Sequence, residues 1–257
     1  MLKWRPAVSF MAFCQNEPQN QGDKQMAVDD RTSLTRKLKK VALRNHADLV
    51  GICAAKIFDD VPLEERPTDI TSDAKAVVVY GIKYNETSDL FKERWYRRMD
   101  ELIGRIDRKL REFLTENGYK AHSISREFDV ADEIQGRPFS ELTQARRRQW
   151  RGAYQKLQDA AVSAGLGWLG KNRIIITPQY GAYVSLSMIV TDAPLVPDEP
   201  FGEDLCGDCD LCLKTCPTGA ILAEGHPDAS LCKPWDCQFA CVRVCHQKWL
   251  EQRSTTQ

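Results

Sequence analysis

The chain lacks several features that would assign it to common protein classes. No run of about 18 or more apolar residues occurs, so no transmembrane helix is expected. The formal net charge is zero, from 36 basic and 36 acidic residues, so no overall field favours a nucleic acid or an anionic membrane. The four histidines lie in no nucleophile motif, and no P-loop is present. Ser–His–Asp hydrolases and P-loop enzymes therefore find no support.

The first 30 residues show little pattern. The apolar stretch from Ala7 to Phe13 is short and is interrupted by Ser9, and no small-residue cleavage site or twin-arginine pair accompanies it. Residues 15–30 are polar and have no periodicity. We therefore expect a disordered leader over residues 1–30 and a cytoplasmic protein.

Residues 31–198 alternate between helical and strand-like patterns. Apolar residues recur every three or four positions in three expected helices, at 33–41, 91–114 and 143–163. Strands are expected at 48–54, 76–82, 173–177 and 182–191. This alternation predicts an α+β or α/β main domain with a mixed sheet and flanking helices. A linker with Pro194, Pro197 and Pro200 then leads to a small C-terminal domain at 199–257.

Eight of the ten cysteines lie between Cys206 and Cys245. A chain that can bury a core does not need a disulfide scaffold, so this grouping indicates metal ligation, whereas Cys53 is expected to be a small buried apolar residue. The first four have the spacing C-x2-C-x2-C-x3-C-P, and they are Cys206, Cys209, Cys212 and Cys216. In two-cluster ferredoxins, three such thiolates bind one [4Fe–4S] cluster and the fourth binds the other. A zinc site would instead need two separated pairs of ligands.

The second group consists of Cys232, Cys237, Cys241 and Cys245. It departs from the usual spacing, with x4, x3 and x3 between successive cysteines, and His246 follows the last one in place of the usual proline. We expect one cluster to be bound by Cys206, Cys209, Cys212 and Cys245. We expect the other to be bound by Cys216, Cys232, Cys237 and Cys241. The alternative is that only the first cluster forms, or that a three-iron species does, because x3 replaces x2 between Cys237 and Cys241. His246 is expected at the surface or beside a cluster, not as an iron ligand.

Three motifs precede the cysteines: A-G-L-G-W-L-G-K-N at 164–172, T-P-Q-Y-G at 177–181 and V-T-D-A-P-L at 190–195. In this order, and followed by the cysteine run, they resemble the epoxyqueuosine reductase family and its shorter relatives over about residues 33–248. The resemblance implies a main domain that cradles a corrinoid such as cobalamin and packs on a ferredoxin-like domain. It implies electrons from an external ferredoxin or flavodoxin and, for the family, a modified tRNA base as substrate. Reductive dehalogenases are more distant relatives.

The glycine-rich segment admits two interpretations. Its glycines would let the backbone approach a large planar ligand closely, with Trp168 packed on that ligand and Lys171 near a phosphate or propionamide. The candidate pocket for a corrinoid or another acceptor is then Gly165, Gly167, Trp168, Gly170, Lys171 and Asn172. Equally, the segment could be a tight turn from helix to strand with Trp168 in the core. It is not a dinucleotide-binding fingerprint, because a helix precedes it and a strand follows.

One feature of the family has no counterpart in this chain. These reductases carry a proton-donating aspartate upstream of the A-G-L-G motif, and at that spacing the chain has Trp150. Asp129, Asp132 and Asp159 do not map onto it. The resemblance therefore leaves the catalytic residues unassigned.

Two basic runs, at 36–40 and 146–151, would suit phosphate contacts to a tRNA or would simply form solvated helix faces. Three functions stay open. The first is an iron–sulfur oxidoreductase of the epoxyqueuosine reductase type. The others are a ferredoxin-like electron-transfer protein that serves a partner enzyme, and a cluster-based redox sensor.

Overall fold

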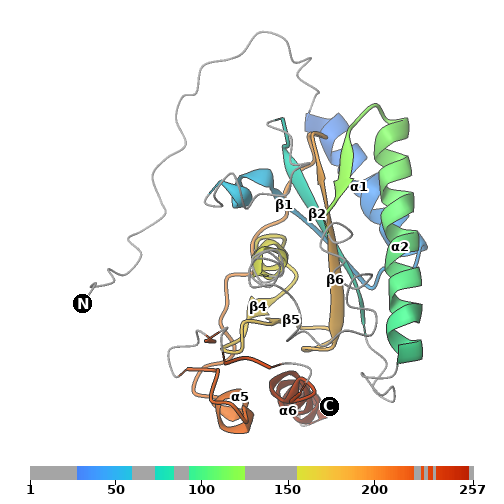
Figure 1. The fold of residues 1–257 in the computed structure, drawn as a ribbon. Helices are drawn as coiled ribbons and strands as arrows, with labels where there is room; N and C mark the ends of the chain where they lie inside the picture. The colour runs from blue at the N-terminus through green and yellow to red at the C-terminus, as the bar shows by residue number, and fades with distance from the viewer. Residues whose placement is uncertain are drawn as a thin grey trace.

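The computed structural model describes residues 28–59, 73–83, 93–124, 155–222, 227–228, 231–233 and 236–254. In chain order its elements are α1 (Val28–Arg44), β1 (Leu49–Ala54), η1 (Ala55–Phe58), β2 (Ala76–Lys83), α2 (Glu93–Glu116), β3 (Ala121–Ser123), a helix over 155–163, β4 (Trp168–Leu169), β5 (Ile175–Ile176), β6 (Val184–Thr191), α5 (Leu211–Thr215) and α6 (Ala240–Ser254) (Figure 1). No helix in this part of the chain is long and apolar enough to cross a membrane. Trp150, the second basic run and the first turns of the expected helix at 143–163 lie outside the described residues.

Four strands form the central sheet in the order β1-β2-β6-β3. Each of the three pairings is antiparallel, with Val79 opposite Met188 at the centre. The sequence predicted a mixed sheet, and for the described strands this is corrected to an antiparallel one within an α+β fold. A continuous apolar run such as β2 shows only that both faces of a strand are buried, and it carries no information on strand direction.

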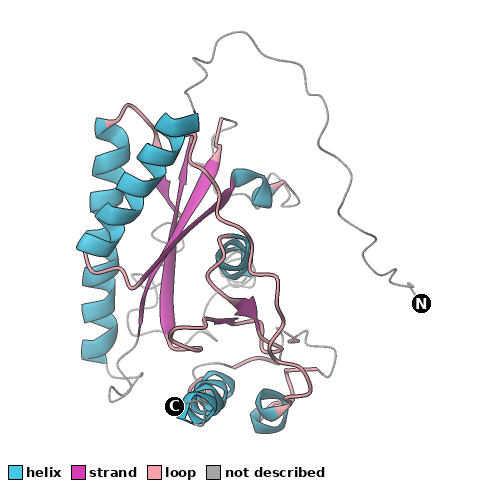
Figure 2. Cartoon of the chain, turned by 180° about the vertical axis from the view of Figure 1, so that it is seen from behind, coloured by secondary structure: helices cyan, strands magenta, loops and turns pink. Residues whose placement is uncertain are grey.

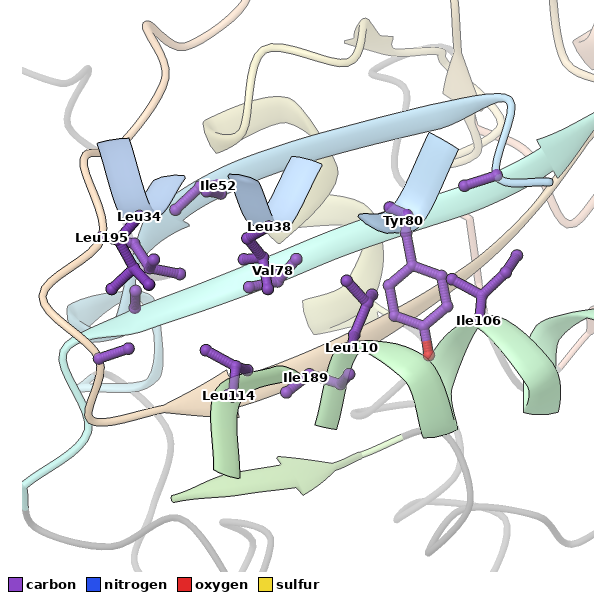
Figure 3. Packing of buried hydrophobic residues seen from close by; sticks show 14 of the residues in the cluster. Leu34, Leu38, Ile52, Val78, Tyr80, Ile106, Leu110, Leu114, Ile189 and Leu195 are labelled. Atoms are coloured by element: carbon purple, nitrogen blue, oxygen red, sulfur yellow. The ribbon is translucent and has the colours of Figure 1, made fainter. Parts of the chain in front are cut away.

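Both faces of the sheet are covered, which explains that apolar run. Val78 and Tyr80 of β2 pack with residues of α1 and α2, whereas Val77 and Val79 pack with residues of the 155–163 helix. The alternation is the period of two expected for a strand. Figure 3 shows the apolar side chains packed between the sheet, α1 and α2. In Figure 2 the two helix layers lie on opposite sides of the sheet. Each buried aliphatic side chain contributes about 1.5–3 kcal/mol, so this packing fixes the main domain.

The limits of the described helices lie close to the expected ones, except at the start of α1, and the start of the helix expected at 143–163 lies outside the described residues. The α1 helix starts at Val28 with Asp29 and Asp30 in its first turn, so Ser33, where the helix was expected to begin, is an internal residue. Three residues of the expected leader are therefore helical. Carboxylates in a first turn interact favourably with the helix dipole, which explains the earlier start. Leu34 and Leu38 are buried as predicted.

A buried polar network ties α2 to the sheet. Asp107 is 1% exposed; its carboxylate accepts hydrogen bonds from the Tyr80 hydroxyl at 3.0 Å and from Arg111 Nε at 2.8 Å. Ser187 donates to the Tyr80 oxygen at 2.9 Å. Burial, followed by the charge of Asp107, raises the pKa of Tyr80 well above its usual value. Because each buried group has partners, the network fixes the position of α2 at little net cost.

The proline-containing linker is fastened to the main domain. The Asp198 carboxylate accepts from the backbone N–H of Ile52 at 2.8 Å and pairs with Lys39, and the Asp198 N–H donates to the Ile52 carbonyl at 2.8 Å. These contacts occupy the outer edge of β1, which would otherwise be unpaired. The cysteine segment therefore starts from a fixed point on the sheet.

Candidate metal centre

The cysteines of the C-terminal segment lie on α5, on α6 and on the loops that flank these helices. Cys212 is a buried residue of α5, and Cys241 and Cys245 lie one turn apart on α6. The two helices pack against each other beside the β4–β5 end of the main domain (Figure 1). No disulfide joins the cysteines in the described part of the chain.

One group of thiols surrounds Cys245. Burial raises the pKa of Cys245 to about 12, and the charges of Cys206, Cys212 and Cys209 contribute in that order. Burial also raises the pKa of Cys212, with further contributions from Cys206 and Cys209. Cys245 therefore lies within electrostatic range of Cys206, Cys209 and Cys212, and also of Cys241. Cys245 and the first three of these are the four residues that the sequence predicts as ligands of one cluster.

A second group of thiols surrounds Cys241. Burial raises its pKa to about 12, followed by the charges of Cys237 and Cys232 and then of Cys212 and Cys216. The effect of Cys212, a member of the first group, places the two groups next to each other. Among the described residues, no three of these side chains are arranged as ligands of a single metal ion. By number and type the eight thiols suit two [4Fe–4S] clusters, and both their division into two groups of four and the individual ligand assignments stay predictions.

The turn after Cys216 supplies hydrogen-bond donors to its sulfur. Burial raises the pKa of this thiol, but the Thr218 hydroxyl, 3.6 Å from Sγ, and the backbone N–H groups of Thr218, Ile221 and Ala220 outweigh it, so that the pKa is lowered. Donors directed at a thiolate are the usual surroundings of a cluster ligand, because they spread its negative charge.

The glycines of the 164–172 segment approach the protein's own backbone. A Cβ on Gly167 would lie 2.1 Å from the Ile176 carbonyl oxygen, and one on Gly165, whose φ is +74°, would lie 2.5 Å from the Glu199 carbonyl oxygen. A Cβ on Gly170 would lie 2.7 Å from Asn172 Oδ1. The structure thus favours the tight turn from helix to strand over a surface for a planar ligand, and a role of these glycines in corrinoid binding stays a prediction.

Lys171 and Asn172 reach the cysteine segments. Lys171 Nζ donates to the carbonyl oxygens of Gly207 at 2.7 Å and Cys209 at 3.0 Å. The Asn172 side chain is buried, and its Nδ2 donates to the Cys241 carbonyl at 3.4 Å. Its Oδ1 accepts from the backbone N–H of Ile174, within the hairpin that β4 and β5 form over residues 168–176. The β4–β5 hairpin therefore holds backbone from both cysteine groups, and the contact of Lys171 with a bound ligand stays a prediction.

We predict that Lys171→Met loosens the first cysteine loop. Two carbonyls lose a charged donor that contributes about 1.4 kcal/mol, a factor of about ten in an equilibrium constant. Iron release to a chelator should become about tenfold faster. Lys214→Met is the matched control, because Lys214 is 71% exposed and pairs with Asp210, the residue just before its own helix. Equal release rates in the two variants would contradict the role of Lys171.

Trp168 is buried in an apolar cluster between the hairpin and the cysteine segment. Its ring stacks on Phe201 with centroids 5.8 Å apart. Cys206, Cys241 and Cys245 pack against the same cluster. Within the described structure, the Trp168 indole N–H has no hydrogen-bond acceptor.

The α6 helix docks on the turn at 178–181 through an aromatic column that was not predicted. Tyr183 stacks on His246 with centroids 3.6 Å apart, and His246 faces Trp249 at 5.3 Å. A Cβ on Gly181, whose φ is +59°, would lie 2.8 Å from the Trp249 ring. The glycine of the T-P-Q-Y-G motif therefore permits close helix packing. His246 is 4% exposed, so the expected surface position is corrected to a buried one.

No protein-family model matches the chain. Over 79 residues it is 48% identical to the epoxyqueuosine reductase of Listeria monocytogenes, which is 30% of this chain and 21% of that protein. Over 172 residues it is 31% identical to the epoxyqueuosine reductase of Cyclobacterium marinum, which is 65% of this chain and 49% of that protein. The matches therefore span about half or less of the length of these relatives.

Solved structures show the same fold. A crystal structure of an epoxyqueuosine reductase aligns with a TM-score of 0.55 and 24% identity, over 78% of this chain and 56% of that one. A catabolic reductive dehalogenase aligns with a TM-score of 0.61 and 19% identity, over 85% of this chain and 32% of that one. The chain is therefore a relative of the epoxyqueuosine reductases, with a mixed α+β fold that they share with the reductive dehalogenases.

Proposed function

We propose that the chain is an iron–sulfur oxidoreductase that takes single electrons from an external ferredoxin or flavodoxin and passes them through two [4Fe–4S] clusters to an acceptor bound at the main domain. The observation that carries this proposal is the packing of α5 on α6, which brings cysteines of both sequence groups together, with Cys206, Cys241 and Cys245 against one apolar cluster. The hairpin contacts of Lys171 and Asn172 support it, because they fix both groups on the main domain. When bound, such clusters supply one-electron transfer.

A corrinoid is the acceptor that the relatives favour, since one of the matched dehalogenase structures is described in terms of B12-dependent dehalogenation. A tRNA is the corresponding substrate proposal, because a matched epoxyqueuosine reductase was crystallised with a modified tRNA stem loop. The first basic run suits such a partner in one respect: Arg36, Lys37 and Lys40 are exposed on α1.

The proposal is tested by the composition of the protein purified without oxygen from corrinoid-supplied cells. We expect about eight irons and eight sulfides per chain, and about one cobalt if a corrinoid is the acceptor. About four irons would contradict the two-cluster assignment. Absence of iron and sulfide would contradict the proposed function altogether.

The second candidate function is a ferredoxin-like protein that serves a partner enzyme. Two observations favour it: the glycines expected to face a ligand face backbone, and no counterpart of the family's aspartate was found in the sequence. Eight irons without cobalt, together with cluster reoxidation only when a second protein is added, would select this function.

A further inference from the structure

The indole N–H of Trp168 needs a partner that the described protein atoms do not provide. Trp168 is 8% exposed, and no acceptor lies within hydrogen-bonding distance of Nε1 in this part of the chain. A buried donor left unsatisfied costs about 1–3 kcal/mol, and native proteins rarely leave one without a partner. A group that binds at this place would therefore complete the site.

The surroundings of Trp168 indicate what that group is. Most of the side chains packed around Trp168 are apolar and offer no hydrogen-bond acceptor, among them Ile176, Ala182 and Val242. Of the four remaining residues, Tyr183 carries a hydroxyl and stacks its ring on His246, and the other three, Cys206, Cys241 and Cys245, carry sulfur. Two of these three, Cys206 and Cys245, are predicted ligands of the same cluster. A sulfur of a cluster bound by these cysteines is therefore an acceptor that would lie in the same packed region as the indole.

The position of the indole is fixed. The backbone of Trp168 pairs with Ile176 across β4 and β5. One face of its ring stacks on Phe201, whose own N–H is bonded to the Val162 carbonyl at 3.0 Å. A rigid donor loses little conformational entropy when it makes a hydrogen bond, so its effect on an acceptor is largely retained.

We propose that the Trp168 N–H donates a hydrogen bond to a sulfur of the cluster predicted at Cys206, Cys209, Cys212 and Cys245, and that it raises the reduction potential of that cluster. The inference rests on the proposed function, which supplies the cluster. Reduction adds one negative charge to the cluster, so a donor to its sulfur stabilises the reduced state more than the oxidised state. Trp168 then tunes this electron carrier from the main domain.

The first test compares Trp168→Phe with Phe201→Leu. The first variant keeps an aromatic side chain and removes the N–H, whereas the second perturbs the same packing and keeps the N–H. Iron and sulfide are counted, and the two potentials are then measured in a mediated titration followed by electron paramagnetic resonance. In Trp168→Phe we expect one potential to fall by about 59 mV, a tenfold change in the equilibrium constant for a one-electron couple. In Phe201→Leu, which keeps the N–H and the pairing of Trp168 with Ile176, the fall in potential should be clearly smaller than in Trp168→Phe.

Unchanged potentials in an iron-replete Trp168→Phe protein would overturn the inference, whereas a wild-type chain without iron and sulfide would overturn the proposed function instead. If Trp168→Phe does not fold, benzothienylalanine at position 168 decides the question, because it keeps the bicyclic shape and lacks only the N–H. Wild-type potentials with this analogue overturn the inference. A lowered potential, or loss of one cluster from the otherwise folded protein, supports it.

Discussion

Replacing Cys245 by alanine is expected to remove one iron–sulfur cluster and to leave the other in place. Cys245 lies on α6 within reach of Cys206, Cys209 and Cys212, and it adjoins the second group through Cys241. A [4Fe–4S] cluster that loses a thiolate ligand is no longer closed, whereas the second group keeps its four thiols. Iron should fall from about eight to about four atoms per chain. Iron and sulfide analysis of the anaerobically purified variant measures the effect.

Double variants test which cysteines bind the same cluster. Cys206→Ala with Cys245→Ala should keep about four irons, because both changes affect one cluster, whereas Cys206→Ala with Cys241→Ala should keep almost none. Cys53→Ala is the matched control: Cys53 is 2% exposed among apolar residues of the sheet, and burial raises its pKa to about 12. It should keep about eight irons. If both doubles retain the same amount of iron, the predicted ligand sets are wrong.

Gly167→Ala is expected to destabilise the main domain by at least about 3 kcal/mol. The added Cβ would lie 2.1 Å from the Ile176 carbonyl oxygen and 2.9 Å from the carbonyl carbon. These are backbone atoms of the paired strand and cannot rotate away, so the β4–β5 pairing has to open. The same hairpin presents Lys171 and Asn172 to the cysteine loops, so cluster retention should fall as well. Denaturant unfolding followed by circular dichroism measures the change.

Two other glycines calibrate this result. A Cβ on Gly202 meets nothing within 4 Å, so Gly202→Ala should stay within about 0.5 kcal/mol of the wild-type stability. Gly118 also has open space, but its φ is +84°, so Gly118→Ala should cost about 1–2 kcal/mol through backbone strain alone. If Gly167→Ala cost no more than Gly118→Ala, the close approach at Ile176 would not be what requires this glycine.

The elements of the main domain were predictable because their signals are local. The apolar run of β2 and the stripe along α2 follow from residues a few positions apart, and burial of Val78, Ile106 and Leu110 confirms them. Two apolar residues at the start of the helix expected at 91–114, Phe91 and Trp95, lie outside the described side chains. Strand direction was not predictable, since it depends on chain connections and not on any single segment.

Part of the site was predictable from spacing, and part depends on distant contacts. The x3 interval between Cys241 and Cys245 is the spacing of one helix face, a signal that could have predicted α6. Burial of His246 depends on Tyr183, which is far away in sequence. The contact of Lys171 with the loop at Cys209 likewise joins segments 38 residues apart, and no local pattern encodes it.

The residues that hold the cysteine segment on the main domain are synthesised before that segment. Trp168, Lys171 and Gly181 all precede Cys206 in the chain. A ribosome adds about 5–20 residues per second and domains generally fold as units, so the sheet and its hairpin can form within seconds, before the last cysteine leaves the exit tunnel. If the proposed clusters form, iron and sulfide would then be delivered to thiols that emerge next to an already folded main domain. Cluster maturation would be the final step of assembly, and a shortage of iron would leave chains with a folded main domain and an incomplete C-terminal segment.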